Sequence, residues 1–315
     1  MLKFLLQRLA STVPVLFVVA LLVFLVLRLG SGDPASIIAG DSATDQDLAQ
    51  IRQSLGLDRS LVEQFVIWLG NILHGDLGYS FFQHKSVAEL IEQRIEPTLS
   101  LALGTLVLAI VIALPLGTLA AWKMGGWLDR ALTCFSVAGF ALPVFVVGYV
   151  LIYYFALVLK WLPVQGYHRL EGWDDMGPWA ARLALPWITL GLAYVALIAR
   201  ITRASVSEAL TEDYVRTARA KGLGEAIVLV RHALANAAVP IVTIIGIGIA
   251  ALISGVVVTE TVFAIPGLGS LMVDSVLNRD FPVIQGLVLF FGASYVVVNL
   301  LVDLSYLILD PRIRY

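Results

Sequence analysis

Long apolar runs separated by short polar segments dominate the chain. They cover residues 9–29, 97–122, 131–159, 183–201, 233–258 and 283–309. An apolar run of about 20 residues can cross the hydrocarbon core of a bilayer as a helix, in which every backbone polar group is satisfied internally. The pattern predicts an all-α polytopic membrane protein with six transmembrane helices.

The first run follows Lys3 and Arg8, a charge pattern that also precedes the core of a secretory signal. A signal core has about 7 to 15 residues and ends at a small-residue cleavage site, whereas this run is longer and no Ala-x-Ala follows it. We therefore expect residues 1–29 to remain as an N-terminal transmembrane helix that starts in the cytoplasm.

Residues 30–96 are more polar, and we expect them to form an extracytoplasmic insertion. Within it, apolar residues recur at helical spacing in two groups, interrupted at residues 56–60, which predicts two short amphipathic helices. The groups are Leu48, Ile51 and Leu55, and then Leu61, Phe65, Trp68, Leu69 and Ile72. Packing on the outer face of the bundle is favoured over substrate recognition, because such stripes usually belong to a core.

Charge sets the expected orientation. With 59% hydrophobic and 14% charged residues, the composition indicates a chain that lies in a lipid membrane. A net charge of -2 gives no sign of nucleic-acid binding. Basic residues gather in the connection at 202–232 and its edges, while residues 260–282 hold only Arg279. The positive-inside rule places 202–232 in the cytoplasm, and an even number of spans puts both termini there.

Reactive groups are scarce. The chain has no G-x-x-x-x-G-K-[ST], G-x-S-x-G or H-E-x-x-H motif, and its four histidines and single Cys134 show no metal-ligand spacing. We therefore predict no catalytic residue, no metal site and no cofactor, so that energy must come from a partner or from a gradient.

Asp303 is the clearest ionisable residue within a span. An intramembrane carboxylate is a candidate for proton coupling. Asp303 has no ionisable neighbour in sequence and lies near the cytoplasmic end of its run, which favours water exposure or hydrogen bonding between helices.

The sequence YVRTARAKGLG at residues 214–224 forms a basic island between apolar runs. Its two interpretations are a loop that only fixes topology and a docking surface for a partner. Ala218 and Gly222 lie four apart, which predicts a small-residue face of a helix flanked by Arg219 and Lys221. The candidate contact residues are Tyr214, Arg216, Thr217, Ala218, Arg219, Lys221 and Gly222.

This segment resembles the conserved cytoplasmic loop of ABC importer permeases, the EAA loop. Arg216, Thr217 and Ala218 stand in place of the Glu-Ala-Ala triplet, Gly222 takes the place of the glycine, and Leu234 alone keeps the later Ile-x-Leu-Pro box. With RHALANAAVP at 231–240, the chain is similar along nearly its whole length to the dipeptide, oligopeptide and nickel permeases. The resemblance implies the type I ABC importer fold, with residues 97–315 as the core permease domain and 202–232 as its coupling loop.

The same resemblance implies a set of partners in a bacterial or archaeal cytoplasmic membrane. These are a second homologous permease, two ABC ATPase subunits and an extracytoplasmic solute-binding protein. The expected function is ATP-driven import of peptides or a related small solute, without a choice among solutes. The alternative is a gradient-driven secondary transporter, which would place acids at the midplane of the membrane and need no docking helix.

The sequence ETVFAIPGLG at residues 260–269 follows the fifth run on the predicted outer side. Proline followed by glycine indicates a turn, and the apolar side chains around it need burial. The resemblance places this segment beside the external mouth of the pathway, so a gate and a plain packing turn are equally consistent with it. The gate candidates are Glu260, Phe263, Pro266, Gly267 and Gly269.

Overall fold

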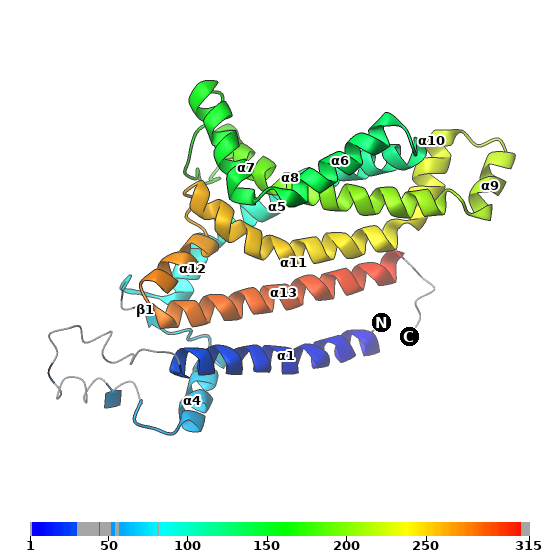
Figure 1. Ribbon diagram of the computed structural model, residues 1–315. Coiled ribbons are helices and arrows are strands. Elements are labelled where there is room, and N and C mark those ends of the chain that lie inside the picture. Colours follow the sequence, from blue (N-terminus) through cyan, green and yellow to red (C-terminus); the bar gives the residue numbers. More distant parts are fainter. Residues whose placement is uncertain (1, 30–43, 45–51, 54–56, 81, 310–315) are drawn as a thin grey trace. The chain divides into compact units, whose positions relative to one another are not determined.

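The computed structural model describes residues 2–29, 44, 52, 53, 57–80 and 82–309 (Figure 1). The described chain is almost entirely helical, with one two-stranded antiparallel hairpin. It divides into two compact units, one of residues 1–94 with 271–296 and the other of residues 95–270 with 297–315.

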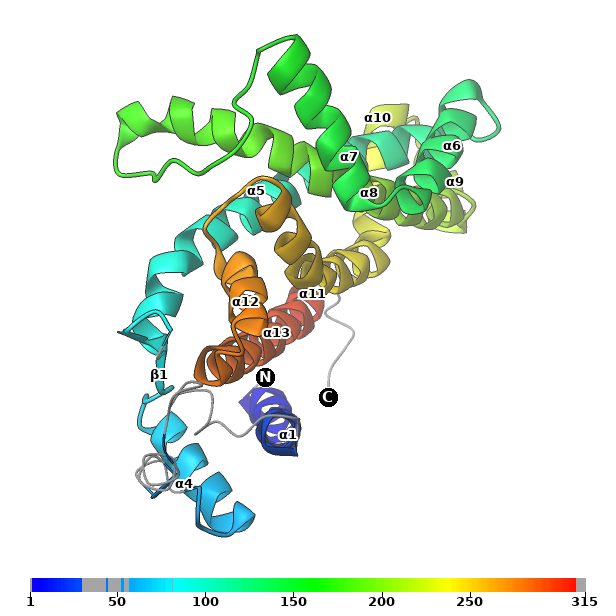
Figure 2. The ribbon, with the colours of Figure 1, turned by 60° about the vertical axis from the view of Figure 1, so that its left-hand side comes forward.

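Helix α8 organises the larger unit. It packs against α6, α7 and α11, and it runs beside α11 in both views (Figures 1 and 2). The helices of this unit are α5 Val87–Trp122 from residue 95 onward, α6 Trp127–Ala141, α7 Val144–Leu151, the π-helix Ile152–Val158, α8 Met176–Ala209, α9 Asp213–Ala220, α10 Glu225–Ile227, the π-helix Val228–Leu234 and α11 Ala238–Val262. The buried face of α8 includes Leu183, Leu190 and Ile198, which make it the core of the unit.

Glycine lets α5 and α8 approach closely. A Cβ atom at Gly117 would lie 2.6 Å from the carbonyl oxygen of Ala199, and one at Gly191 would lie 2.9 Å from the side chain of Leu108. Small residues at such crossings are typical of membrane helix packing, where close backbone approach replaces a hydrophobic driving force.

The smaller unit contains α1 Leu2–Leu29, α4 Leu61–Leu73 and the hairpin of Tyr79–Ser80 with Lys85–Ser86. It also holds most of α12 Leu268–Leu277 and the first part of α13 Phe281–Leu309. The hydroxyl of Ser80 donates to the carboxylate of Asp280, and both residues are buried. This bond fixes the hairpin to a segment 200 residues later in the chain.

Among the described residues, three helices are long and apolar enough to cross a membrane: Val87–Trp122, Trp173–Ala209 and Phe281–Ser305. Two bent helix pairs raise that number to five if each pair is one span. The predicted N-terminal span corresponds to α1, a helix of 28 residues. The predicted total of six therefore stays a prediction.

Two predicted spans differ in detail from the helices that are observed. The run at 131–159 breaks at Pro143, because the residue before a proline is driven out of the α region and Leu142 is extended, with ψ 124°. Helix α5, which corresponds to the second predicted span, begins at Val87 rather than at residue 97. Of the two predicted short helices after the first span, the second is confirmed as α4, whereas the first falls largely outside the described residues.

Candidate functional site

The basic segment folds as a short helix with a defined end. Helix α9 starts after Glu212 and carries Asp213 in its first turn, where negative charge is favoured. It ends because Gly222 adopts a left-handed φ of 80°. The N–H of Gly222 donates to the carbonyl of Arg219 (2.9 Å) and that of Leu223 to the carbonyl of Ala218 (3.3 Å), which is the Schellman pattern.

The inner face of α9 corrects one sequence prediction. Val215 and Ala218 are buried, and together with Val228 they form a small apolar cluster against which Leu210 packs. Ala218 therefore points into its own chain, and Gly222 lies beyond the helix. The prediction that this pair shares one face of a helix is wrong, because the left-handed Gly222 ends the helix after Ala220, whereas docking of a partner by this segment stays a prediction.

The outer face of α9 is polar and exposed. Arg216 pairs with Asp213 (3.2 Å), and Arg219 donates from two nitrogens to the carboxylate of Glu225 (2.9 and 3.2 Å). We call Tyr214, Arg216, Thr217, Arg219 and Lys221 the basic face, since all five are exposed.

Tyr214 is a partly exposed aromatic residue of the basic face. It is 39% exposed, and partial burial raises the pKa of its hydroxyl, with the charge of Glu212 adding to the effect. After the helix, Leu223, Ile227 and Val230 are exposed apolar side chains, which we call the apolar flank. An apolar patch bordered by charge is typical of a protein-binding surface.

A π-helix, Val228–Leu234, connects the segment to α11. The helical stretch Glu225–Leu234, which includes this π-helix, meets Ala238–Ile249 at a bend of 62°. Single π-helical turns inside helices occur frequently at functional positions.

An ion pair at the same end of α8 was not predicted. Two nitrogens of Arg203 donate to the two carboxylate oxygens of Asp129 in α6 (2.7 and 2.9 Å), and the N–H of Gly125 adds a third bond (2.9 Å). Asp129 is buried. One indication is visible in the sequence, since Asp129 is the single acid in the connection at 123–130.

The predicted outer turn is built around Glu260. This carboxylate is fully buried and accepts from the hydroxyl of Thr98 (2.6 Å) and the N–H of Ser270 (2.9 Å). The oxygen of Thr98 accepts in turn from the N–H of Leu268 (2.8 Å). The turn is thereby fixed to α5 by a side chain 162 residues away.

The glycines of the turn leave room for that carboxylate. A Cβ at Gly267 would lie 2.1 Å from Glu260 Oε1, and one at Gly269 would lie 2.6 Å from the Cα of Val257. Phe263 and Ile265 are almost fully buried. Burial, which both interpretations of this segment require, is observed, and the gate itself stays a prediction.

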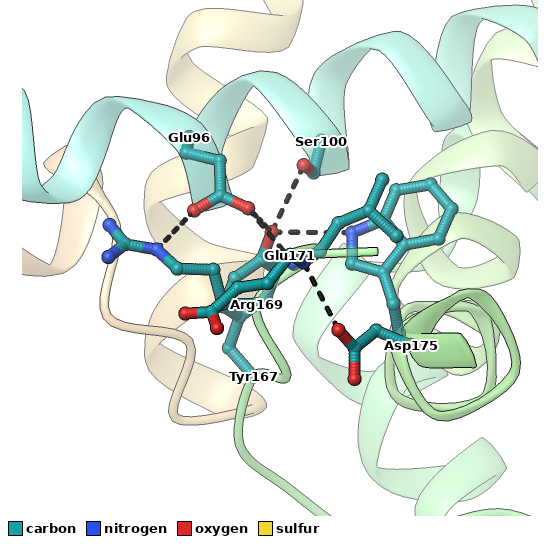
Figure 3. Close-up of polar contacts among 8 residues, drawn as sticks. Glu96, Ser100, Tyr167, Arg169, Glu171 and Asp175 are labelled. Atoms are coloured by element: carbon teal, nitrogen blue, oxygen red, sulfur yellow. Dashed lines mark hydrogen bonds and ion pairs between the residues drawn. The ribbon is translucent and has the colours of Figure 1, made fainter. Parts of the chain in front are cut away.

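A second polar cluster binds the loop before α8 (Figure 3). The carboxylate of Glu96 accepts from Tyr167 Oη (2.7 Å), Arg169 Nε (2.7 Å) and the N–H of Leu170 (3.4 Å). Trp179 Nε1 (3.3 Å) and the hydroxyl of Ser100 (3.1 Å) bond to the same tyrosine oxygen. Partial burial raises the pKa of Tyr167, and Glu96 also raises it.

These residues hold the loop against both α5 and α8. The backbone also joins it to the outer turn, since the N–H of Gly166 donates to the carbonyl of Phe263 (2.9 Å). Sequence reasoning missed this cluster because its members are far apart in the chain and carry no motif.

Comparison with known proteins identifies the family of the chain. Residues 113–315 match the family described as binding-protein-dependent transport system inner membrane component, and residues 1–102 match the N-terminal family of such membrane components. The chain belongs to this family. A probable peptide ABC transporter permease protein of Sinorhizobium fredii is 51% identical over 99% of each chain, and the glutathione transport system permease protein of Escherichia coli K12 is 42% identical over 100% of each.

A solved structure shows the fold of this permease. An inward-facing form of the MetNI methionine ABC transporter aligns with a TM-score of 0.59 and 16% identity, covering 70% of the present chain and 96% of the other. The type I ABC importer fold is therefore confirmed, and the alternative of a gradient-driven secondary transporter is wrong.

The permease is a non-catalytic, multi-pass subunit of an ABC transporter in the inner membrane. Family membership implies that it works with an ATPase, a binding protein and another permease subunit. Proton coupling through Asp303 was considered mainly because of the secondary-transporter alternative. Since that alternative is wrong, the main reason to expect such coupling is removed.

Proposed function

We propose that this permease imports peptides or a glutathione-like solute, forming the pathway with a second, homologous permease. A binding protein would deliver the solute outside, and two ABC ATPase subunits would drive the cycle inside. The full-length similarity to a peptide permease and to a glutathione permease supports this range of solutes. In this arrangement both termini and residues 202–232 lie in the cytoplasm.

The observation that carries the proposal is the construction of α9. The helix is held by its own apolar contacts with Val228 and Leu210, so its exposed side needs no other part of the described chain. It projects beyond the end of α8 in the larger unit (Figure 1). We infer that the basic face and the apolar flank bind the ATPase subunit, with Gly222 setting the direction in which the chain leaves the helix.

The ATPase contact should depend most on Tyr214. Aromatic side chains with both apolar and polar atoms dominate interfaces, and truncating one commonly costs about 2 kcal/mol, or more than tenfold in affinity. Exposed ion pairs contribute about 0 to 1 kcal/mol each. We expect Tyr214→Ala to lower ATPase co-purification strongly, and Arg216→Gln to lower it slightly.

On the outer side, Glu260, Phe263, Pro266, Gly267 and Gly269 are proposed to close the pathway. The support is that this turn is bound to both α5 and the loop before α8, so that it can move with helices rather than as a free loop.

Transport by the reconstituted complex tests the proposal. The permease, its partner permease and the ATPase subunits are placed in vesicles, with the binding protein outside and ATP on the ATPase side. We expect uptake of labelled di- and oligopeptides or glutathione only when ATP and the binding protein are both present. Uptake by the isolated permease under a pH gradient alone would contradict import by an ABC mechanism.

Variants then test the ATPase-binding surface. Tyr214→Ala is compared with Arg130→Gln, which changes an exposed residue of the other predicted cytoplasmic connection. ATPase co-purification and uptake are measured at matched membrane expression. If Tyr214→Ala behaves like Arg130→Gln, the basic face does not bind the ATPase.

A further inference from the structure

Helix α4 has three distinct sides. Phe65 and Trp68 point toward α1, where they contact Phe17 and Phe24 with ring centroids 5.3 to 5.8 Å apart. Successive residues turn by about 100°, so Val62, Val66 and Leu73 share a second side. Glu63, Gln64 and Asn71 lie on the third side, together with the partly exposed Ile67.

The second side is apolar and uncovered. Val62, Val66 and Leu73 are 73%, 62% and 79% exposed, so the described chain leaves these three aligned aliphatic side chains largely uncovered. We call these three residues the apolar stripe. A stripe of this kind marks a binding surface for protein or lipid.

The contacts with α1 give the depth at which α4 lies. Residues 9–27 of the first span are uncharged, and Arg8 and Arg28 bound them. At about 1.5 Å per residue, Phe24 lies roughly 6 Å and Phe17 roughly 16 Å inside the boundary marked by Arg28. Because Phe65 contacts both rings, α4 lies beside the outer half of the span rather than outside the membrane.

The helix is too short to cross the bilayer. It has 13 residues, about 20 Å, whereas a span needs about 20 residues. Its start is closed by a capping box, in which the N–H of Glu63 donates to the hydroxyl of Ser60 and the Glu63 carboxylate accepts from the N–H of Ser60. At its end, His74 bonds through its ring to the carbonyl of Gly70 (2.8 Å). These bonds satisfy two backbone N–H groups at the start of the helix and one carbonyl near its end.

We propose that α4 is an interfacial helix, lying in the outer leaflet with its apolar stripe among the lipid acyl chains. An amphipathic helix buries its apolar face about 5 to 10 Å into the boundary between headgroups and acyl chains, which agrees with the depth of Phe24, whereas Phe17 lies deeper. The polar side then faces headgroups and water. The bound partner is the phospholipid bilayer, and residues 61–73 are a membrane anchor within the predicted extracytoplasmic insertion.

Site-directed labelling of the permease complex in vesicles tests this placement. In a Cys134→Ser background, single cysteines replace Val62, Val66 and Leu73 on the stripe and Glu63 and Asn71 on the polar side, and each receives a nitroxide label. Val18→Cys in α1 provides a reference near the middle of the span. Collision with oxygen, which concentrates in lipid, is compared with collision with a water-soluble nickel chelate.

We expect the three stripe positions to collide several-fold more with oxygen than with the nickel chelate, and positions 63 and 71 to show the reverse. In a second measurement, a fluorophore at position 66 should be quenched more by lipids labelled near the headgroup than by lipids labelled at the chain end, with the opposite order at position 18. Only variants that purify with the parent's yield are compared.

Two outcomes overturn the proposal. Strong collision with the nickel chelate at all five positions of α4 places the helix in water. Protection of the stripe from both reagents means that a protein covers it, and repeating the measurement without the binding protein identifies that case. Neither result depends on whether ATP-driven uptake is observed, so the placement of α4 and the proposed function fail separately.

Discussion

The outer turn and α9 are stabilised in opposite ways. The turn surrounds a buried carboxylate, and glycines bring its backbone so close that a methyl group would collide with Glu260. Helix α9 has two buried residues of its own, Val215 and Ala218, and its ion pairs are exposed. The turn is fixed by hydrogen bonds to a buried carboxyl group, whereas α9 is fixed by a few apolar contacts.

This difference indicates what each region can do. A buried polar group needs its hydrogen-bond partners, so the turn keeps one geometry or loses several bonds together. A helix with little buried surface adapts to a partner at small cost, and elements that move are drawn from such weakly stabilised parts. The outer end should therefore behave as a rigid assembly and α9 as an adaptable contact.

The largest effect is expected from Glu260→Ala. The change leaves the Thr98 hydroxyl and the Ser270 N–H without their acceptor in a buried site, which should lower the free energy of unfolding by about 3 kcal/mol or more. Thermal unfolding of the purified permease complex measures it. Thr261→Val is the matched control, because that hydroxyl bonds only to Val257 of its own helix (2.9 Å) among the described contacts.

A smaller loss is expected from Thr98→Val. The two side chains have the same shape, but valine removes the bond to Glu260 and the acceptor for the N–H of Leu268, at a cost of about 2 kcal/mol. Thr98→Ser keeps the hydroxyl and should unfold close to the parent. If the valine and serine variants unfold at the same temperature, the Thr98–Glu260 bond does not fix the turn.

For α9, Gly222→Ala should act through backbone strain alone. A Cβ there meets nothing within 4 Å, but φ is 80°, and a side chain in the left-handed region costs about 1 kcal/mol. Gly224→Ala also meets nothing within 4 Å and has φ -64°, so it should cost far less. Faster amide exchange in residues 213–223 of the first variant, and not of the second, is the expected result.

The smallest effect is expected from Arg219→Gln. Its pair with Glu225 is roughly 40% exposed on both sides and contributes at most about 1 kcal/mol. Unfolding and amide exchange of α9 should stay close to the parent at physiological salt. A loss as large as that of Thr98→Val would show that charge, rather than apolar contact, holds α9 in place.

The sequence predicted what depends on local pattern. Apolar length predicted helices over the six runs, although six membrane spans stay a prediction, and the stripe from Leu61 to Ile72 predicted α4, whose Phe65 and Trp68 contact α1. The helix predicted in the basic segment is observed as α9, and its docking role stays a prediction.

What the sequence could not supply depends on distant partners or on backbone conformation. Nothing near Glu260 indicates Thr98, and nothing near Glu96 indicates Tyr167 and Arg169. The orientation of Ala218 was predicted wrongly because the left-handed conformation of Gly222 decides where the helix ends. Ala218 and Gly222 are four residues apart, but they do not share a helix face because the helix ends between them.

The bond between Ser80 and Asp280 has a consequence for biosynthesis. The hairpin leaves the ribosome early, but its buried partner is made 200 residues later. At about 5 to 20 residues per second, the hairpin waits on the order of 10 to 40 s before its hydroxyl can reach that carboxylate. During this interval the smaller unit lacks residues 271–296, so the unit can close only when synthesis of the chain is nearly finished.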